Sequence, residues 1–135
     1  MNEKGLTLIE ILASIVILSI IIISLLSFFV QSSRSTNVSK SIMNATYIAQ
    51  TTMEEMYSVI TATKSINELS KPATYNEIVK TANQVVYQKN VSNHSVTVEL
   101  TPYTVDASLV NLKVKVNKDT KQEAQMEMLV SWKKE

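Results

Sequence analysis

Gly5 and Glu10 are the residues whose types and positions most suggest chemistry. Gly5 is the only glycine of the 135-residue chain, and it follows Lys4 at the junction between a short polar leader and an apolar run. Glu10 is a carboxylate at the head of residues 11–30, which carry no charged side chain. A carboxylate close to a lipid bilayer costs free energy unless a cation compensates it. A simple membrane anchor needs neither the glycine nor the carboxylate, so this pattern indicates a function beyond anchoring.

The apolar run is long enough to span a bilayer. A hydrocarbon core of about 30 Å needs about 20 helical residues, and residues 11–30 meet that length. A lipid-embedded helix tolerates serine because its hydroxyl can bond a carbonyl of the preceding turn. The polar side chains of the run are all serines: Ser14, Ser19, Ser24 and Ser27. The run exceeds the apolar core of a secretory signal, and no small-x-small site follows it, so we expect it to stay in the mature protein.

The stretch Lys-Gly-Leu-Thr-Leu-Ile-Glu, residues 4–10, resembles the cleavage and methylation motif of type IV prepilins and pseudopilins. In that family a membrane peptidase cuts after the glycine, on the cytoplasmic side, and methylates the new amino terminus. The resemblance therefore implies that Gly5 and Leu6 form the processing site and that Glu10 serves assembly. The usual residue after the cut is phenylalanine, and here it is Leu6. Many major pilins carry proline or glycine inside the apolar run, and residues 11–30 contain neither.

The resemblance also implies an organisation of the chain. It implies a leader at residues 1–5 and a transmembrane and filament-core helix at residues 6–33. The amphipathic half of the same helix would cover residues 34–64, and a small globular domain with a C-terminal antiparallel sheet would cover residues 65–135. The charges that flank the span are nearly balanced and do not set its orientation. The short leader and the resemblance place the amino terminus in the cytoplasm. The subunit would cross the cytoplasmic (inner) membrane once before assembly and lie in a cell-surface or extracellular filament afterwards.

The implied partners are the prepilin peptidase, the membrane and other pilin subunits. Cleavage would create an ammonium group at Leu6. In a filament, Glu10 of one subunit could pair with the Leu6 amine of a neighbour, so that both charges are compensated in a low-dielectric core.

Residues 31–63 predict that the helix continues beyond the span. They contain no glycine or proline, and apolar side chains recur at the spacing of one helical face. That stripe consists of Val38, Ile42, Ala45, Ala49, Met53, Met56 and Ile60. Polar residues such as Lys40, Gln50 and Glu54 fill the opposite side. We expect the apolar stripe to pack on a small sheet.

The carboxy-terminal third predicts strands with one buried and one solvated face, because apolar and polar residues alternate. The alternating apolar positions are Val96, Val98 and Leu100, then Leu112, Val114 and Val116, then Ala124, Met126, Met128, Val130 and Trp132. Residues 117–121 predict a hairpin turn, and residues 84–91 predict a further strand. Thr74 and Glu77 match a capping box, which predicts a short helix over residues 74–81. The expected fold class is α+β: a long N-terminal helix packed on a three- or four-stranded antiparallel sheet, as in pilins.

The composition gives an enzyme little support. The chain has no cysteine, which excludes disulfides and thiolate metal sites. A single glycine leaves no Gly-rich loop for phosphate, and the acids do not converge on one loop as calcium requires. We therefore expect no catalytic residue, no metal and no cofactor. The lone histidine, His94, is expected at the surface or at a strand end. The net charge of +1 produces no field that would mark a nucleic-acid binder.

Lysines around the predicted hairpin leave one binding question open: Lys113, Lys115, Lys118 and Lys121. They are interpreted as a solvated sheet face that also blunts an edge, with contact to DNA or an anionic wall polymer as the alternative.

Three functions remain as hypotheses. The chain is a minor pilin or pseudopilin of a type IV pilus-like filament; or a subunit of a competence DNA-uptake or type II secretion pseudopilus; or a single-span anchored sensor or binding module that never polymerises. Cleavage after Gly5 would separate the last hypothesis from the first two.

Overall fold

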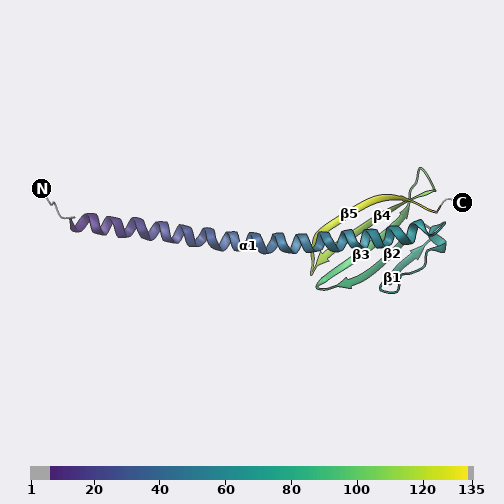
Figure 1. Ribbon diagram of the computed structural model, residues 1–135, viewed down its shortest axis with the longest axis horizontal. Coiled ribbons are helices and arrows are strands. Elements are labelled where there is room, and N and C mark those ends of the chain that lie inside the picture. Colours follow the sequence, from purple (N-terminus) through teal and green to yellow (C-terminus); the bar gives the residue numbers. More distant parts are fainter. Residues whose placement is uncertain (1–6, 134–135) are drawn as a thin grey trace. The chain divides into compact units, whose positions relative to one another are not determined.

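The computed structural model describes residues 7–133, and the chain divides into two compact units, Met1–Lys40 and Ser41–Glu135. Helix α1 (Leu8–Thr61) begins in the first unit and ends in the second (Figure 1). The remaining elements belong to the second unit. They are the 3-10 helix η1 (Ile66–Glu68) and the strands β1 (Asn76–Thr81), β2 (Gln84–Val91), β3 (His94–Pro102), β4 (Leu109–Lys118) and β5 (Lys121–Ser131).

The strands described by residues 7–133 form one antiparallel, 5-stranded sheet in the order β1-β2-β3-β4-β5. The β2–β3 and β4–β5 hairpins close at the pairs Val91↔His94 and Lys118↔Lys121. The first loop residue of each hairpin has a positive φ, 55° at Ser92 and 53° at Asp119. Tight hairpins need such values because their backbone must follow the twist of the strands. The turn predicted at residues 117–121 is therefore confirmed.

The core of the second unit lies between α1 and one face of the sheet. The helix contributes Ala45, Ala49, Met53, Met56 and Ile60, and the strands contribute Val85, Tyr87, Val96, Val98, Leu100, Val110, Leu112, Val114, Val116 and Val130. The buried residues of β3 and β4 alternate with half-buried ones. The predicted α+β fold and the predicted faces of these strands are confirmed. The helical stripe is shorter than expected, since Ile42 is 43% exposed.

Residues 74–81 differ from the sequence-based expectation. Their second part is β1, an edge strand, and this strand raises the sheet above the three or four strands expected. An isolated short helix is marginal in water, whereas pairing with β2 gives this backbone a partner through the tight loop between Thr81 and Gln84. All residues of β1 are exposed. The segment therefore lacks the alternation by which the other strands are recognised.

Candidate functional site

The first turn of α1 contains a capping box built from Thr7 and Glu10. The backbone N–H and the hydroxyl of Thr7 donate to Glu10 Oε2, at 2.7 and 3.0 Å. The backbone N–H of Glu10 lies 3.4 Å from Thr7 Oγ1. This reciprocal arrangement satisfies donors that a helix N-terminus leaves without an intrahelical partner. A Thr-x-x-Glu pattern ahead of an apolar run signals this capping box in the sequence. From the sequence alone, Thr7 was nevertheless missed as a partner of Glu10.

Glu10 keeps capacity for a further bond. Both bonds from Thr7 reach Oε2, and an ionised carboxylate offers about four acceptor positions on two oxygens. Among the described residues, the donors to its carboxylate are the neutral N–H and hydroxyl of Thr7. The two predicted processing residues, Gly5 and Leu6, lie outside the described residues.

The apolar part of α1 presents side chains outward all around. The helix is long and apolar enough to cross a membrane, and 0% of its most apolar window is buried. Its serines donate their hydroxyls to the carbonyl four residues earlier, at 2.7–2.9 Å: Ser14, Ser19, Ser24 and Ser27. Each hydroxyl is thereby satisfied inside the helix, as lipid requires of a polar group.

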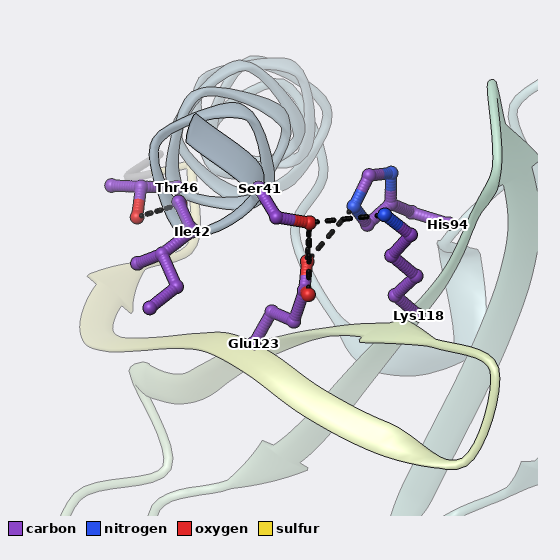
Figure 2. Close-up of polar contacts among 6 residues, drawn as sticks. All are labelled: Ser41, Ile42, Thr46, His94, Lys118 and Glu123. Carbon is purple, nitrogen blue, oxygen red and sulfur yellow. Dashed lines mark hydrogen bonds and ion pairs between the residues drawn. The ribbon is translucent and has the colours of Figure 1, made fainter. Parts of the chain in front are cut away.

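A second polar cluster joins α1 to the sheet where the second unit begins (Figure 2). The Ser41 hydroxyl lies 2.9 Å from both carboxylate oxygens of Glu123. Lys118 Nζ donates to Ser41 Oγ at 3.2 Å, and His94 Nε2 lies 3.1 Å from Glu123 Oε2. Four segments, α1, β3, β4 and β5, thus meet at one carboxylate.

A β-bulge directs Glu123 into this cluster. Val116 pairs with Ala124, but Asn117 pairs with Gln122, so Glu123 has no partner across the strand pair. A bulge bends its strand and re-aims a side chain. Figure 2 shows the carboxylate of Glu123 turned toward Ser41 and His94. Alternation alone would have placed Glu123 on the solvated face, which is why sequence reasoning missed it.

The chemistry of this cluster is structural. In a nucleophilic triad the imidazole accepts the hydroxyl proton, whereas here the Glu123 carboxylate lies between Ser41 and His94. Partial burial raises the pKa of Glu123, but the bonds from Ser41 and His94 and the charge of Lys118 lower it by more, so the net pKa lies below its ordinary value. His94 does begin a strand as expected, yet it is only 8% exposed rather than a surface residue.

Glu55 forms the centre of a third cluster. Tyr75 and Lys89 donate to Glu55 Oε2 at 2.7 and 2.6 Å, and Lys89 Nζ lies 4.4 Å from the centre of the Tyr75 ring. Burial and the adjacent carboxylate raise the pKa of Tyr75 far above its ordinary value. The cluster ties the segment before β1 to α1 and β2. The Lys89–Glu55 ion pair is half-buried, with side chains 12% and 38% exposed, and its hydrogen bonds are made, the form in which such pairs are tolerated.

The lysines of β4 have acidic or hydroxyl partners. Lys115 lies 2.7 Å from Glu99 and Lys113 lies 3.4 Å from Glu127, both across neighbouring strands. Lys118 binds Ser41 beside Glu123. Opposite charges on facing strands stabilise a sheet face, and each pairing reduces the positive field available to a polyanion. Within residues 7–133, no group of three or more His, Asp or Glu side chains gathers as metal ligands.

One comparison with known proteins gives a match. The family described as "Prokaryotic N-terminal methylation motif" matches residues 1–26. No curated protein and no solved structure matches the chain. The matched segment contains Gly5, Thr7 and Glu10, and it is the type IV prepilin and pseudopilin signature. This signature supports a subunit of the pilin or pseudopilin type, and the fold of the described residues is pilin-like.

Proposed function

We propose that this chain, which carries the type IV prepilin signature, is a structural subunit of a type IV pilus-like filament and acts as a minor pilin or pseudopilin. The observation that supports it most is the placement of the motif. The matched residues 1–26 include the first part of α1, a helix long and apolar enough to cross a membrane, and the end of that helix belongs to the α+β unit Ser41–Glu135. Such a chain can be stored in a membrane and later transferred into a protein assembly without refolding its sheet.

Processing is the first step of the proposed function. A prepilin peptidase cuts the peptide bond between Gly5 and Leu6, with water as the co-reactant, and the new Leu6 amine is methylated. Glycine before the cut leaves room for the peptidase because it has no side chain. The product is a chain whose positive amino terminus lies near Glu10.

Glu10 then serves assembly. Its Oε2 is occupied by Thr7, which leaves acceptor capacity on the other oxygen for the Leu6 ammonium of a neighbouring subunit. A charge-assisted hydrogen bond is about twice as strong as a neutral one, and it gains further strength where water is excluded. The neutral bonds from Thr7 lower the cost of keeping the carboxylate in the unassembled chain.

The first test is the mass of the mature chain. Wild type should lack residues 1–5 and carry one methyl group on Leu6, as measured by mass spectrometry of the intact protein from its host membrane. Gly5→Leu should abolish the cut, since the added side chain fills the space that the peptidase needs. Asn2→Leu, in the same leader but away from the cut, is the matched control and should be processed normally. A Gly5→Leu chain with the wild-type mature mass contradicts the proposal.

A second test concerns abundance and system. Quantifying this chain against other pilins in sheared filaments checks the minor role, and a dominant band of this chain would make it a major subunit. Deleting its gene and measuring DNA uptake and protein secretion separately distinguishes a competence pseudopilus from a type II secretion pseudopilus. A non-polymerising anchored module would keep Met1 and be absent from the sheared fraction. The charge pairing on β4 favours protein partners over DNA or an anionic wall polymer.

A further inference from the structure

Strand β1 presents an apolar projection at one edge of the sheet. The β1–β2 register shifts between Glu77 and Val79, so Ile78 is the extra residue of a bulge. Ile78 is 57% exposed and Val79 is 37% exposed, although both are large apolar side chains on a hydrogen-bonded strand. Lys80 follows directly, and its ammonium donates to the carbonyl of Leu69 at 3.1 Å. This edge therefore carries an apolar side chain held out by the backbone with a cation beside it.

The opposite edge of the sheet has an apolar pocket of about 280 Å³. It lies between α1 and β5 and is lined by Met53, Tyr57 and Met128, with Glu54 at its side. Methionine and tyrosine make an adaptable apolar lining. Glu54 is exposed, and among the described residues its hydrogen-bond partner is Gln50, at 3.2 Å. The pocket therefore combines an apolar floor with an anionic rim, the complement of the β1 edge.

We propose that Ile78 of one subunit inserts into the Met53–Tyr57–Met128 pocket of a second copy, with Lys80 facing Glu54. The projection and the pocket lie at opposite ends of the strand order, β1 and β5. A contact between two different surfaces of the same protein is heterologous, and such contacts propagate into rings or open filaments instead of stopping at a dimer. The inference rests on the proposed filament function and adds which surfaces of the soluble unit meet.

Another exposed apolar side chain, Val105, fits less well. Val105 is 83% exposed but lies in the loop between β3 and β4, next to Asp106, whose carboxylate accepts from the N–H of Ser108 at 2.8 Å. An acid beside Val105 would face Glu54 with like charge. Of the two, Ile78 alone combines a strand backbone with a neighbouring cation.

Disulfide formation tests the contact, because the chain has no cysteine of its own. The double variant Ile78→Cys/Tyr57→Cys replaces two exposed side chains, so folding should be little affected. A disulfide needs Cβ atoms about 3.5–4.5 Å apart, which only a seated projection provides. In filaments from cells that overproduce the double variant, so that its copies become neighbours, mild oxidation should give a ladder of disulfide-linked dimers, trimers and larger species. The matched control, Val105→Cys/Tyr57→Cys, should give no ladder.

Each alternative outcome decides the matter. Dimers without larger species would show a two-fold contact and overturn the heterologous arrangement. An equal ladder from the control would show collision alone and also overturn it. If wild-type chain is processed and found in sheared filaments but the Ile78→Cys/Tyr57→Cys chain gives no ladder, this inference fails while the proposed function stands. If wild-type chain keeps Met1 and is absent from filaments, both fail.

Charge exchange gives a second test of the same contact. Lys80→Glu or Glu54→Lys alone would place like charges together and should reduce the disulfide yield by about two- to five-fold, the range of an exposed ion pair. Combining both changes restores opposite charges and should restore the yield. Failure of the combined variant to recover would remove Lys80 and Glu54 from the contact.

Discussion

Glu10 accepts two hydrogen bonds from Thr7 of its own chain before any partner is present. The Thr7 N–H and hydroxyl both reach its Oε2, so the carboxylate is hydrogen-bonded at the head of an apolar helix. Sequence position alone marked Glu10 as unusual, and the resemblance implied a role in assembly, which stays a proposal. The cap that holds Glu10 follows from a local Thr-x-x-Glu pattern, so the sequence contains its signal, although Thr7 was not paired with Glu10 in the sequence-based prediction.

Replacing Glu10 should separate assembly from folding. Glu10→Ala should leave the second unit intact, because Glu10 lies in the other unit. Incorporation into sheared filaments should fall by about tenfold or more, since truncating one partner leaves the opposite charge unpaired. The measurements are the filament fraction by immunoblot and the thermal melt of the full chain in detergent, followed by Trp132. This residue is the only tryptophan and is buried in the second unit.

Glu68→Ala is the matched control for that experiment, because Glu68 is an exposed carboxylate on η1. Its filament fraction should equal that of wild type. Normal incorporation of Glu10→Ala would contradict the assembly role.

The cluster at Glu123 should make the second unit sensitive to acid. Burial raises the pKa of Glu123, but Ser41, His94 and Lys118 lower it to a net value below that of the unfolded chain. A depressed pKa stabilises the folded state at pH values above the unfolded pKa, about 4.3 for glutamate, and this stabilisation is lost as the pH falls through the folded value. The melting temperature of the full chain, measured from pH 7 to pH 3, should therefore fall toward acid pH.

Glu123→Gln should flatten that acid limb and also lower the melting temperature at pH 7, because the amide cannot replace the carboxylate. Glu68→Gln serves as the control and should follow the wild-type profile. An acid limb that is equally steep in Glu123→Gln would show that other carboxylates account for it.

At the scale of elements, two consecutive residues of α1 in the second unit face in different directions, one into the core and one into solvent. Met53 is 8% exposed and packs in the core, whereas Glu54 is exposed. Met53→Lys should destabilise the unit by a few kcal/mol, because it places an unpaired charge between helix and sheet. That is a large share of the 5–15 kcal/mol roughly typical of a domain.

Glu54→Lys changes the charge one residue along and should cost under about 0.5 kcal/mol. Thermal melts of both full-length variants, followed by Trp132 fluorescence, compare them directly. Equal melting temperatures would mean that α1 does not present Met53 to the sheet.

The elements differ in how far the sequence could predict them, and the reason is burial. Strands β3 and β4 each have one fully buried face, so alternation revealed both the strands and their faces. Strand β1 has no buried residue, so the local capping pattern led to a predicted helix, whereas pairing with β2 makes the segment a strand. The bulge at Glu123 likewise depends on pairing between β4 and β5, which no local pattern encodes. Edges and bulges are determined by their neighbours.

At the scale of the whole molecule, the two units contain different features. The unit Met1–Lys40 holds the motif and most of the apolar helix, while Ser41–Glu135 holds the sheet and the polar clusters. The signature predicted the family type because it is contiguous in sequence. The surfaces of the second unit, including the β1 edge and the α1–β5 pocket, bring together residues distant in the chain. Those surfaces became visible only in the folded structure.

The serine hydroxyls of α1 have a consequence for transfer between environments. Because Ser14, Ser19, Ser24 and Ser27 each bond a carbonyl of their own helix, this stretch exchanges no hydrogen bonds when lipid around it is replaced by other helices. The apolar stretch is therefore nearly indifferent to which of the two surrounds it. In the proposed filament, the energetic difference between the stored and the assembled subunit would be concentrated at the helix head and on the soluble surfaces. A small change in the interactions at the helix head or on the soluble surfaces would then favour either the membrane-stored or the filament-assembled subunit.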